Sequence, residues 1–198
     1  MARTALNIFA QNNVLVYALL TENDEELNTE INDVLVMATV DDDVFIRKAT
    51  QDAEVFVALD DRSERQEVVE ELIKKYKKMP VNAIHRSAQL ASDVSLGHGN
   101  LIGAGVSIGA ATSIGNHCTV GSGAQLDFQT KMEDFVEVGA GSIVGARASL
   151  GKKAFIGSGV VIGSGVQVGA NAKAGAGSVV VRNIKEESTV WGNPAQEL

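Results

Sequence analysis

The sequence predicts a small α/β domain followed by a parallel β-helix of hexapeptide repeats. From Ile84 to Val180, every sixth residue is aliphatic, and no insertion breaks the step. All 20 glycines follow residue 96. The charge balance changes where the repeat begins: residues 1–83 carry 17 acidic and 9 basic side chains, whereas residues 84–198 carry 8 of each. These observations predict two domains, 1–82 and 83–198.

The composition excludes several classes of protein. A chain of 198 residues that is 45% hydrophobic is long enough and apolar enough to bury a core. The net charge of −8 argues against nucleic-acid binding, which needs basic side chains to neutralise phosphates. The single cysteine, Cys118, excludes an intrachain disulfide and a cysteine-rich zinc site. No apolar run approaches the roughly 20 residues that span a bilayer, so we expect a cytoplasmic protein without a membrane partner.

The step of six predicts a coil of three short strands. Glycine follows the aliphatic residue at most of the repeats from Gly97 to Gly175. A helix would lose about 1 kcal/mol at each glycine relative to alanine. A triangular coil instead turns at a corner after each strand, and we expect those glycines to supply positive φ there. Each aliphatic side chain then points into the prism and stacks on its counterpart about 18 residues away.

The first domain is expected to alternate between strands and helices. Apolar runs predict strands at 12–20, 34–40 and 53–59. Helices are expected at 2–11, at 41–49 and at 63–78, where Ser63 and Gln66 match a capping box and lysines crowd the last turn. A nucleotide-binding α/β domain normally places glycines after its first strand, but this part has none and begins with a helix. The expectation is therefore a truncated Rossmann-like domain that lacks its first strand and phosphate loop.

The glycine rule of the repeats fails at two positions, Asp127 and Glu133. Both lie in LDFQTKMEDFVE (126–137), two consecutive repeats rich in polar and charged residues. Places where a sequence breaks its own rule are often functional or strained. Two interpretations stay open, a functional site and a solvated rim or subunit contact.

The whole chain resembles the sugar O- and N-acetyltransferases of the sialic acid O-acetyltransferase type, which are hexapeptide-repeat acyltransferases. The resemblance covers AEVFVALDDRSER, VNAIHRSAQLASDVSLG, the repeats and the closing SVVVRNIKEESTVWGNPA. It implies a left-handed β-helix, a homotrimer, acetyl-CoA bound between neighbouring β-helices, and a small acceptor such as a nucleotide sugar. The family's Gly-x-Pro-Ala tail corresponds to Gly192-Asn193-Pro194-Ala195.

The resemblance also places the family's functional residues on this chain. The histidine that acts as general base falls on Phe128, and its acidic partner falls on Gln129; neither can do that chemistry. A second histidine near the acetyl group falls on Glu137. The contacts to coenzyme A fall near Ser158 and Ala176. The acidic pair that contacts nucleotide falls on Thr21 and Glu22. The family's Gly-Asp-Asn motif falls on Asp60, Asp61 and Arg62, so that only Asp61 is kept.

Two functions follow from this pattern. The first is an acetyl-CoA-dependent acyltransferase with altered catalytic residues, in which Asp127 or Glu137 serves as the base, since a buried carboxylate can act as one. Lys131 and Arg147 would alternatively pair with those carboxylates as rim salt bridges. The second function is a catalytically inactive trimeric scaffold that binds a ligand or partner in the old cleft.

A zinc site is the third possibility. Some trimeric left-handed β-helices are zinc carbonic anhydrases that use three histidines and show a close His-x4-His pair. His85, His98 and His117 are spaced 13 and 19 residues apart, so the sequence predicts no metal.

Overall fold

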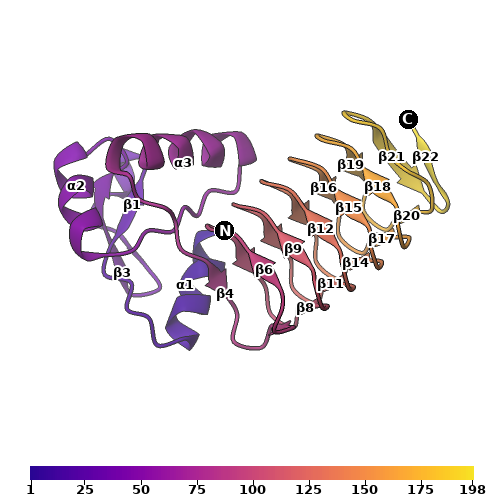
Figure 1. Ribbon diagram of the computed structural model, residues 1–198. Helices are drawn as coiled ribbons and strands as arrows, with labels where there is room; N and C mark the ends of the chain where they lie inside the picture. The colour runs from indigo at the N-terminus through magenta and orange to yellow at the C-terminus, as the bar shows by residue number, and fades with distance from the viewer. The chain divides into compact units, whose positions relative to one another are not determined.

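The computed structural model describes residues 1–198 as two units, Met1–Ala83 and Ile84–Leu198. Figure 1 shows that the first unit combines helices with a small sheet, whereas the second is a stack of short strands. The elements of the first unit are α1 (Ala2–Gln11), β1 (Leu19–Thr21), a 3-10 turn η1 (Asp24–Glu26), β2 (Glu30–Ile31), β3 (Val34–Thr39), α2 (Asp43–Asp52) and α3 (Arg62–Tyr76). None of the helices is long and apolar enough to cross a bilayer.

The sheet of the first unit is smaller than the apolar runs predict. Its order is β1-β3-β2, with β1 parallel and β2 antiparallel to β3. The run 12–20 contributes only Leu19 and Leu20 to a strand, and Leu15 is 87% exposed. The run 53–59 forms no strand, although Val81 donates a backbone hydrogen bond of 2.8 Å to Val55. An apolar run becomes a strand only where a neighbour completes its hydrogen-bond ladder, and here only β3 has neighbours on both sides.

Helix α3 begins two residues earlier than the predicted capping box. Asp61 is its N-cap, and Asp61 Oδ1 accepts hydrogen bonds from the backbone N–H groups of Ser63 and Glu64, at 2.8 and 3.0 Å. These two hydrogen bonds lower the pKa of Asp61, and the bond from the Glu64 N–H has the larger effect. The prediction that Ser63 and Gln66 cap the helix is wrong, because an aspartate stood closer to the helix start and its short carboxylate reaches two amides.

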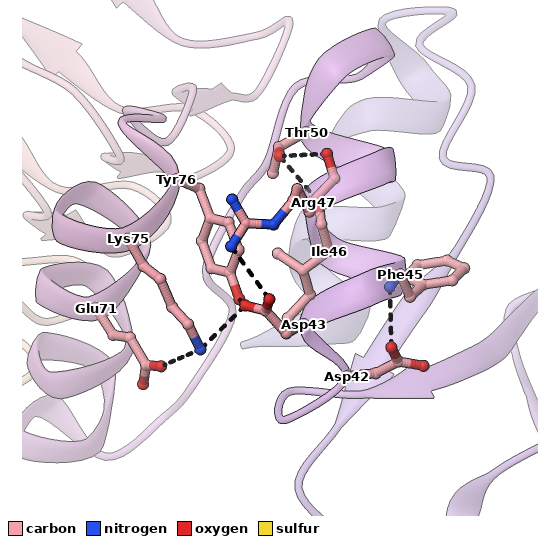
Figure 2. Close-up of polar contacts among 9 residues, drawn as sticks. All are labelled: Asp42, Asp43, Phe45, Ile46, Arg47, Thr50, Glu71, Lys75 and Tyr76. Carbon is pink, nitrogen blue, oxygen red and sulfur yellow. Dashed lines mark hydrogen bonds and ion pairs between the residues drawn. The ribbon is translucent and has the colours of Figure 1, made fainter.

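A cluster of polar side chains joins α2 to α3, as Figure 2 shows. The Tyr76 hydroxyl donates to Asp43 at 2.7 Å, and Lys75 and Arg47 each approach the same carboxylate at 3.1 Å. The Tyr76 hydrogen bond, followed by those of Lys75 and Arg47, lowers the pKa of Asp43 to about 2. Lys75 also contacts Glu71, and the pKa of Lys75 is raised chiefly by Asp43. The cluster therefore ties together two helices that have few buried residues of their own.

The second unit is a left-handed parallel β-helix in which every predicted aliphatic position is the second residue of a two-residue strand. The strands are β4 (Ala83–Ile84), β5 (Gln89–Leu90), β6 (Ser95–Leu96), β7 (Leu101–Ile102), β8 (Ser107–Ile108), β9 (Ser113–Ile114), β10 (Thr119–Val120), β11 (Gln125–Leu126), β12 (Lys131–Met132), β13 (Glu137–Val138), β14 (Ile143–Val144), β15 (Ser149–Leu150), β16 (Phe155–Ile156), β17 (Val161–Ile162), β18 (Gln167–Val168), β19 (Lys173–Ala174) and β20 (Val179–Val180). The step of six is confirmed along its whole length.

Successive strands belong to three different sheets. An eight-stranded sheet contains β4, every third strand after it up to β19, and the two last strands of the chain, β21 (Thr189–Gly192) and β22 (Ala195–Glu197). A six-stranded sheet begins with β5, and a five-stranded sheet begins with β6. Pairing is parallel and in register over one coil, as in Thr119 with Glu137 and Leu126 with Val144. The aliphatic residues of all three sheets fill one interior, where Ile102, Val120 and Ile156 are fully buried. The small residues four places after them, such as Val136 and Ala148, complete that core.

Glycine occurs at two positions of a turn, and the two positions have different roles. The glycine directly after the strand does not supply the positive φ that the sequence predicts for it. Gly109 follows its aliphatic residue, and a Cβ there would lie 2.6 Å from the backbone nitrogen of Phe128 in the next coil. Glycine is needed at this position because the backbones of neighbouring coils approach each other closely there. Positive φ occurs two residues later, as at Gly159, where φ is 67° and a Cβ would meet nothing within 4 Å. Non-glycine residues also occupy that second position, Arg147 with φ of 59° among them.

A hairpin closes the far end of the β-helix. Strand β21 (Thr189–Gly192) pairs in parallel with β19, and β22 (Ala195–Glu197) pairs antiparallel with β21. The indole of Trp191 lies against Gly175, where any Cβ would clash with its ring. The hairpin thus covers an open strand edge that would otherwise invite further pairing.

Asp43 gives the first unit a stability that depends on pH. Because its folded pKa lies below the unfolded value, the stabilisation is present above about pH 4 and disappears as the pH falls toward 2. We expect Asp43→Asn to lower the urea midpoint of helix unfolding at pH 6, and the difference from the native chain to shrink between pH 4 and 2. Circular dichroism at 222 nm reads this unit selectively, because all α-helices lie in it. A difference that stays constant with pH would contradict the assignment.

Candidate functional site

The corners of the β-helix carry the candidate residues, and each corner is a column of turns 18 residues apart. The Phe128 corner joins the six-stranded to the five-stranded sheet and comprises residues 109–111, 127–129, 145–147 and 163–165. The serine–glycine corner joins the eight-stranded to the six-stranded sheet and comprises residues 121–123, 139–141, 157–159 and 175–177. The histidine corner, the third, comprises residues 97–99, 115–117, 133–135 and 151–153.

The two breaks in the glycine rule both supply a hydrogen-bond acceptor to a turn. Asp127 Oδ1 accepts from the backbone N–H of Phe128 at 2.7 Å, and Glu133 Oε2 accepts from that of Lys152 at 2.8 Å. Asp134 does the same for Asn116, also at 2.7 Å. The ladder between coils leaves these turn amides without a backbone acceptor, so a carboxylate there satisfies a strong donor. Asp127 and Glu133 therefore have a structural role in the chain itself.

Phe128 and Arg147 form the most prominent contact at the Phe128 corner. The Cζ atom of Arg147 lies over the Phe128 ring, 5.2 Å from its centroid, and the Arg147 backbone N–H donates to the Phe128 carbonyl at 3.0 Å. The ring is 40% exposed. The sequence had left Arg147 as a candidate ion-pair partner for nearby carboxylates, and it stacks on an aromatic ring instead. Such a cation–π contact contributes about 0.5–1 kcal/mol at an exposed site.

A single chain does not bring Asp127 and Glu137 together. Asp127 lies at the Phe128 corner and is exposed. Glu137 belongs to β13 of the eight-stranded sheet, where Val138 points inward and its neighbour Glu137 consequently points outward. That sheet forms the side of the triangular prism opposite the Phe128 corner. Any site that uses both carboxylates needs two copies of the chain.

Ser158 and Ala176, by contrast, are stacked neighbours on the serine–glycine corner. A Cβ on Gly157 would lie 2.6 Å from the Ala176 nitrogen, and Gly177 donates a backbone hydrogen bond to the Ser158 carbonyl at 2.9 Å. Both residues are exposed, and each precedes an exposed glycine of positive φ. Neither the Ser158 N–H nor the Ala176 N–H donates within the chain. This corner therefore presents backbone donors that no large side chain covers.

The histidines and the cysteine take part in local packing. His117 is buried and its ring stacks on Phe135, with centroids 4.9 Å apart. His85 contacts the Ser87 hydroxyl at 2.8 Å. Cys118 is buried and its Sγ lies 3.0 Å from the Glu133 carbonyl oxygen. No group of three or more His, Cys, Asp or Glu side chains is arranged to hold a metal ion.

The residues of the first unit that the resemblance singles out, the nucleotide-contacting pair and the Gly-Asp-Asn motif, are part of local structure. Thr21 ends β1, and its hydroxyl donates to Glu26 at 2.6 Å. Glu22 follows directly. Asp60 and Arg62 flank Asp61, whose carboxylate caps α3. Thr21 and Glu22 therefore lie at the carboxyl end of β1, and residues 60–62 lie at the start of α3.

The Phe128–Arg147 pair was the site feature that the sequence did not reveal. The two residues are 19 apart, one coil plus one residue, so a coil of 18 would have placed them side by side. What the spacing does not show is which way a long side chain turns at a corner. Within the same two coils, the possible partners of Arg147 included the carboxylates of Asp127 and Glu137 as well as the Phe128 ring. The sequence alone could not decide among them.

Comparison with known proteins gives strong structural matches only. No protein-family model and no curated protein sequence matches the chain. Its structure matches a histidine-to-alanine variant of GDP-perosamine N-acetyltransferase from Caulobacter crescentus, crystallised with CoA and GDP-perosamine, at a TM-score of 0.90 and 28% identity. That match covers 100% of this chain and 91% of the other.

Two further structures are similar at lower identity and support the fold. The acetyltransferase domain of PglB from Neisseria gonorrhoeae, in complex with acetyl coenzyme A, has a TM-score of 0.90 and 21% identity, over 99% of this chain and 93% of that domain. WeeI from Acinetobacter baumannii has a TM-score of 0.62 and 21% identity, over 96% of this chain and 91% of the other. The predicted combination of a short α/β part and a left-handed β-helix is confirmed.

Proposed function

The chain has the fold of the hexapeptide-repeat, left-handed β-helix sugar acetyltransferases over its whole length, and from this we propose that it is an acetyl-CoA-dependent acyltransferase. The observation that carries the proposal is the match of all 198 residues to an N-acetyltransferase crystallised with CoA and a nucleotide sugar. The acceptor would be a small amine or alcohol, and a nucleotide sugar is the acceptor class that this match favours.

The serine–glycine corner is the proposed place for coenzyme A. The free N–H groups of Ser158 and Ala176 can donate to the amide carbonyls of an extended pantetheine chain, while exposed glycines leave room beside the backbone. The donor set therefore fits an uncharged, hydrogen-bonding arm. Acetyl-CoA would supply the activated acetyl group as a thioester.

Acetyl transfer requires the acceptor nitrogen or oxygen to lose a proton as it attacks the thioester carbonyl. The candidate bases are Asp127 and Glu137. Because they lie on opposite sides of one prism, we propose that the Phe128 corner of one copy faces the eight-stranded sheet of another. Asp127 then holds the turn through the Phe128 N–H, and the Glu137 carboxylate of the neighbouring copy accepts the proton as the new C–N or C–O bond forms. The thioester C–S bond breaks, and the CoA sulfur takes that proton and leaves as the thiol.

The alternative function is an inactive scaffold that binds a ligand or partner. Phe128 and Gln129 favour it, because the resemblance places the general base and its acidic partner on these two residues. The two functions differ in one measurable property, turnover. Both allow acetyl-CoA to bind, and only the enzyme releases its thiol.

The deciding experiment combines calorimetry of acetyl-CoA binding with an assay of thiol release in the presence of nucleotide amino-sugars. The only cysteine of the chain, Cys118, is 1% exposed, so a thiol reagent reports chiefly the released CoA. Binding with turnover supports the acyltransferase. Binding without turnover supports the scaffold, and the absence of both would refute the acetyltransferase.

Phe128→His tests the position assigned to the missing base. An imidazole at this exposed corner should raise acetyl transfer by roughly 10²-fold, the low end of what a placed general base contributes. Steady-state thiol release measures it. Gln129→His, one residue along the same turn, is the matched control and should have little effect. Equal rates for Phe128→His and the native chain would count against the proposed register.

Ser158→Trp tests the cofactor corner. A large ring should cover the backbone donors of Ser158 and its stacked neighbour and weaken acetyl-CoA binding about tenfold or more, as measured by calorimetry. Lys152→Trp is the control, since Lys152 also is exposed and precedes a residue of positive φ, Lys153, at the histidine corner. If the two variants bind acetyl-CoA equally, coenzyme A does not use the serine–glycine corner.

We further propose that the chain assembles as a homotrimer through its apolar outward residues. Ile143 and Val161 stack on the six-stranded sheet and are 42% and 36% exposed, while Phe155 is 39% exposed on the eight-stranded sheet. The outward residues of the five-stranded sheet are instead polar: Ser95, Ser113, Lys131, Ser149 and Gln167. Packing two of the three faces against neighbours would remove the exposed apolar stripe from water.

Val161→Glu should dissociate the trimer, because it places a charge in the apolar stripe. Sedimentation velocity would show the change from about three chain masses to one. Ser149→Glu, the same charge on the polar face, should leave the trimer intact. A native chain that sediments as a monomer, or a Val161→Glu chain that stays trimeric, contradicts the proposed contact.

A further inference from the structure

The Arg147 guanidinium is held at the protein surface without a carboxylate partner. It makes no ion pair or hydrogen bond within the chain, and its side-chain contact is with the Phe128 ring at 5.2 Å. Arg47 and Lys78, by comparison, pair with Asp43 and Glu54. A guanidinium that stacks on an aromatic face keeps the N–H groups of its rim free to donate.

Asp127, which directly precedes Phe128, uses its carboxylate within its own turn. The Asp127 carboxylate accepts the Phe128 N–H at 2.7 Å, and the Asp127 carbonyl accepts from the hydroxyls of Thr130 and Thr112 at 2.7 and 3.1 Å. Asp127 thus fixes the turn that carries the Phe128 ring. The ring in turn positions the guanidinium, and no carboxylate of the same chain pairs with it.

The space around the pair is open. In the coils before and after the pair, the residues of the Phe128 corner are small: Ala110, Ala111, Ser164 and Gly165. A Cβ on Gly165 would meet nothing within 4 Å. The other long or charged side chains of the pair's own two turns are Asp127, whose carboxylate is used by the Phe128 N–H, and the neutral Gln129, so Arg147 is the cation of these turns. A molecule lying along the corner would meet the free edge of the guanidinium.

We propose that Arg147, supported by Phe128, binds an oxyanion carried by the acceptor substrate, either a phosphate or a carboxylate. The planar fork of a guanidinium matches both groups through paired hydrogen bonds. That the anion belongs to an acceptor substrate rests on the proposed acyltransferase function, whereas the anion site itself rests on the geometry of this corner. Phe128, at the position that the resemblance assigns to a catalytic base, then serves to orient a binding residue.

The variant Arg147→Gly removes the positive charge without destabilising the fold. Arg147 has φ of 59°, a left-handed conformation that costs an L-residue stability and that glycine adopts freely, and Gly165 occupies the same place one coil later. The variant should therefore melt no lower than the native chain. Lys153→Gly is the matched control, because it removes a cation at φ of 58° from the histidine corner.

The probes are GDP, for a diphosphate, and glucuronate, for a sugar carboxylate, each titrated by calorimetry at low salt. We expect the native chain to bind one of them, Arg147→Gly to bind it at least tenfold more weakly, and Lys153→Gly to bind it within twofold of the native chain. Phe128→Leu should weaken binding a few-fold, since the guanidinium remains but loses its support. Which probe binds identifies the anion.

Three results with the probes would overturn the inference: no binding of either probe to the native chain, equal binding by Arg147→Gly, or an equal loss in Lys153→Gly. Acetyl-CoA is titrated in parallel. If Arg147→Gly weakens acetyl-CoA as much as the probe, the residue serves the phosphates of the cofactor and the inference is wrong. If the native chain binds the probe through Arg147 and does not bind acetyl-CoA, the anion site stands and the acyltransferase function fails.

Discussion

The second unit depends on how closely one coil can lie on the next. Its parallel ladder repeats with the same register from coil to coil, and at most turns the Cα of a glycine lies directly against the following turn. A Cβ on Gly109 or Gly115 would come within 2.6 Å of an atom of the next coil. The glycines therefore set the spacing, and the buried aliphatic columns fill the space that this spacing encloses.

The same close stacking produces the polar features of the corners. A turn amide that meets a glycine has no backbone acceptor, and the chain deals with this in two ways. At the Phe128 and histidine corners, the side chains of Asp127, Glu133 and Asp134 accept those N–H groups. At the serine–glycine corner the amides of Ser158 and Ala176 stay unpaired. The unpaired amides of the serine–glycine corner suit a ligand with carbonyl oxygens. The turns whose amides bind a carboxylate are rigid, which suits a turn that holds a specific side chain in place.

Triangular geometry also decides which residues can act together. Ten residues separate Asp127 from Glu137, about half of one coil, so they face opposite sides of the prism. One coil plus one residue separates Phe128 from Arg147, so they touch. An assembly of several copies is consequently part of the proposed chemistry, whereas the anion site at Arg147 is complete within one chain. The Phe128 ring is compatible with both the proposed acetyl transfer and the anion site, because it orients the Arg147 cation and leaves proton transfer to Glu137.

The sequence by itself determined the β-helix, its step, its interior and its start, because a hexapeptide phase held from Ile84 to Val180 permits few other structures. It also located helices α1, α2 and α3, whose patterns are local. The tertiary structure decided the rest. Strands at 12–18 and 53–59 did not form, since a strand needs a neighbour that no local pattern supplies. Likewise, only the stacking of coils showed that Asp127 holds a turn, that Arg147 rests on Phe128, and that the two candidate carboxylates lie apart.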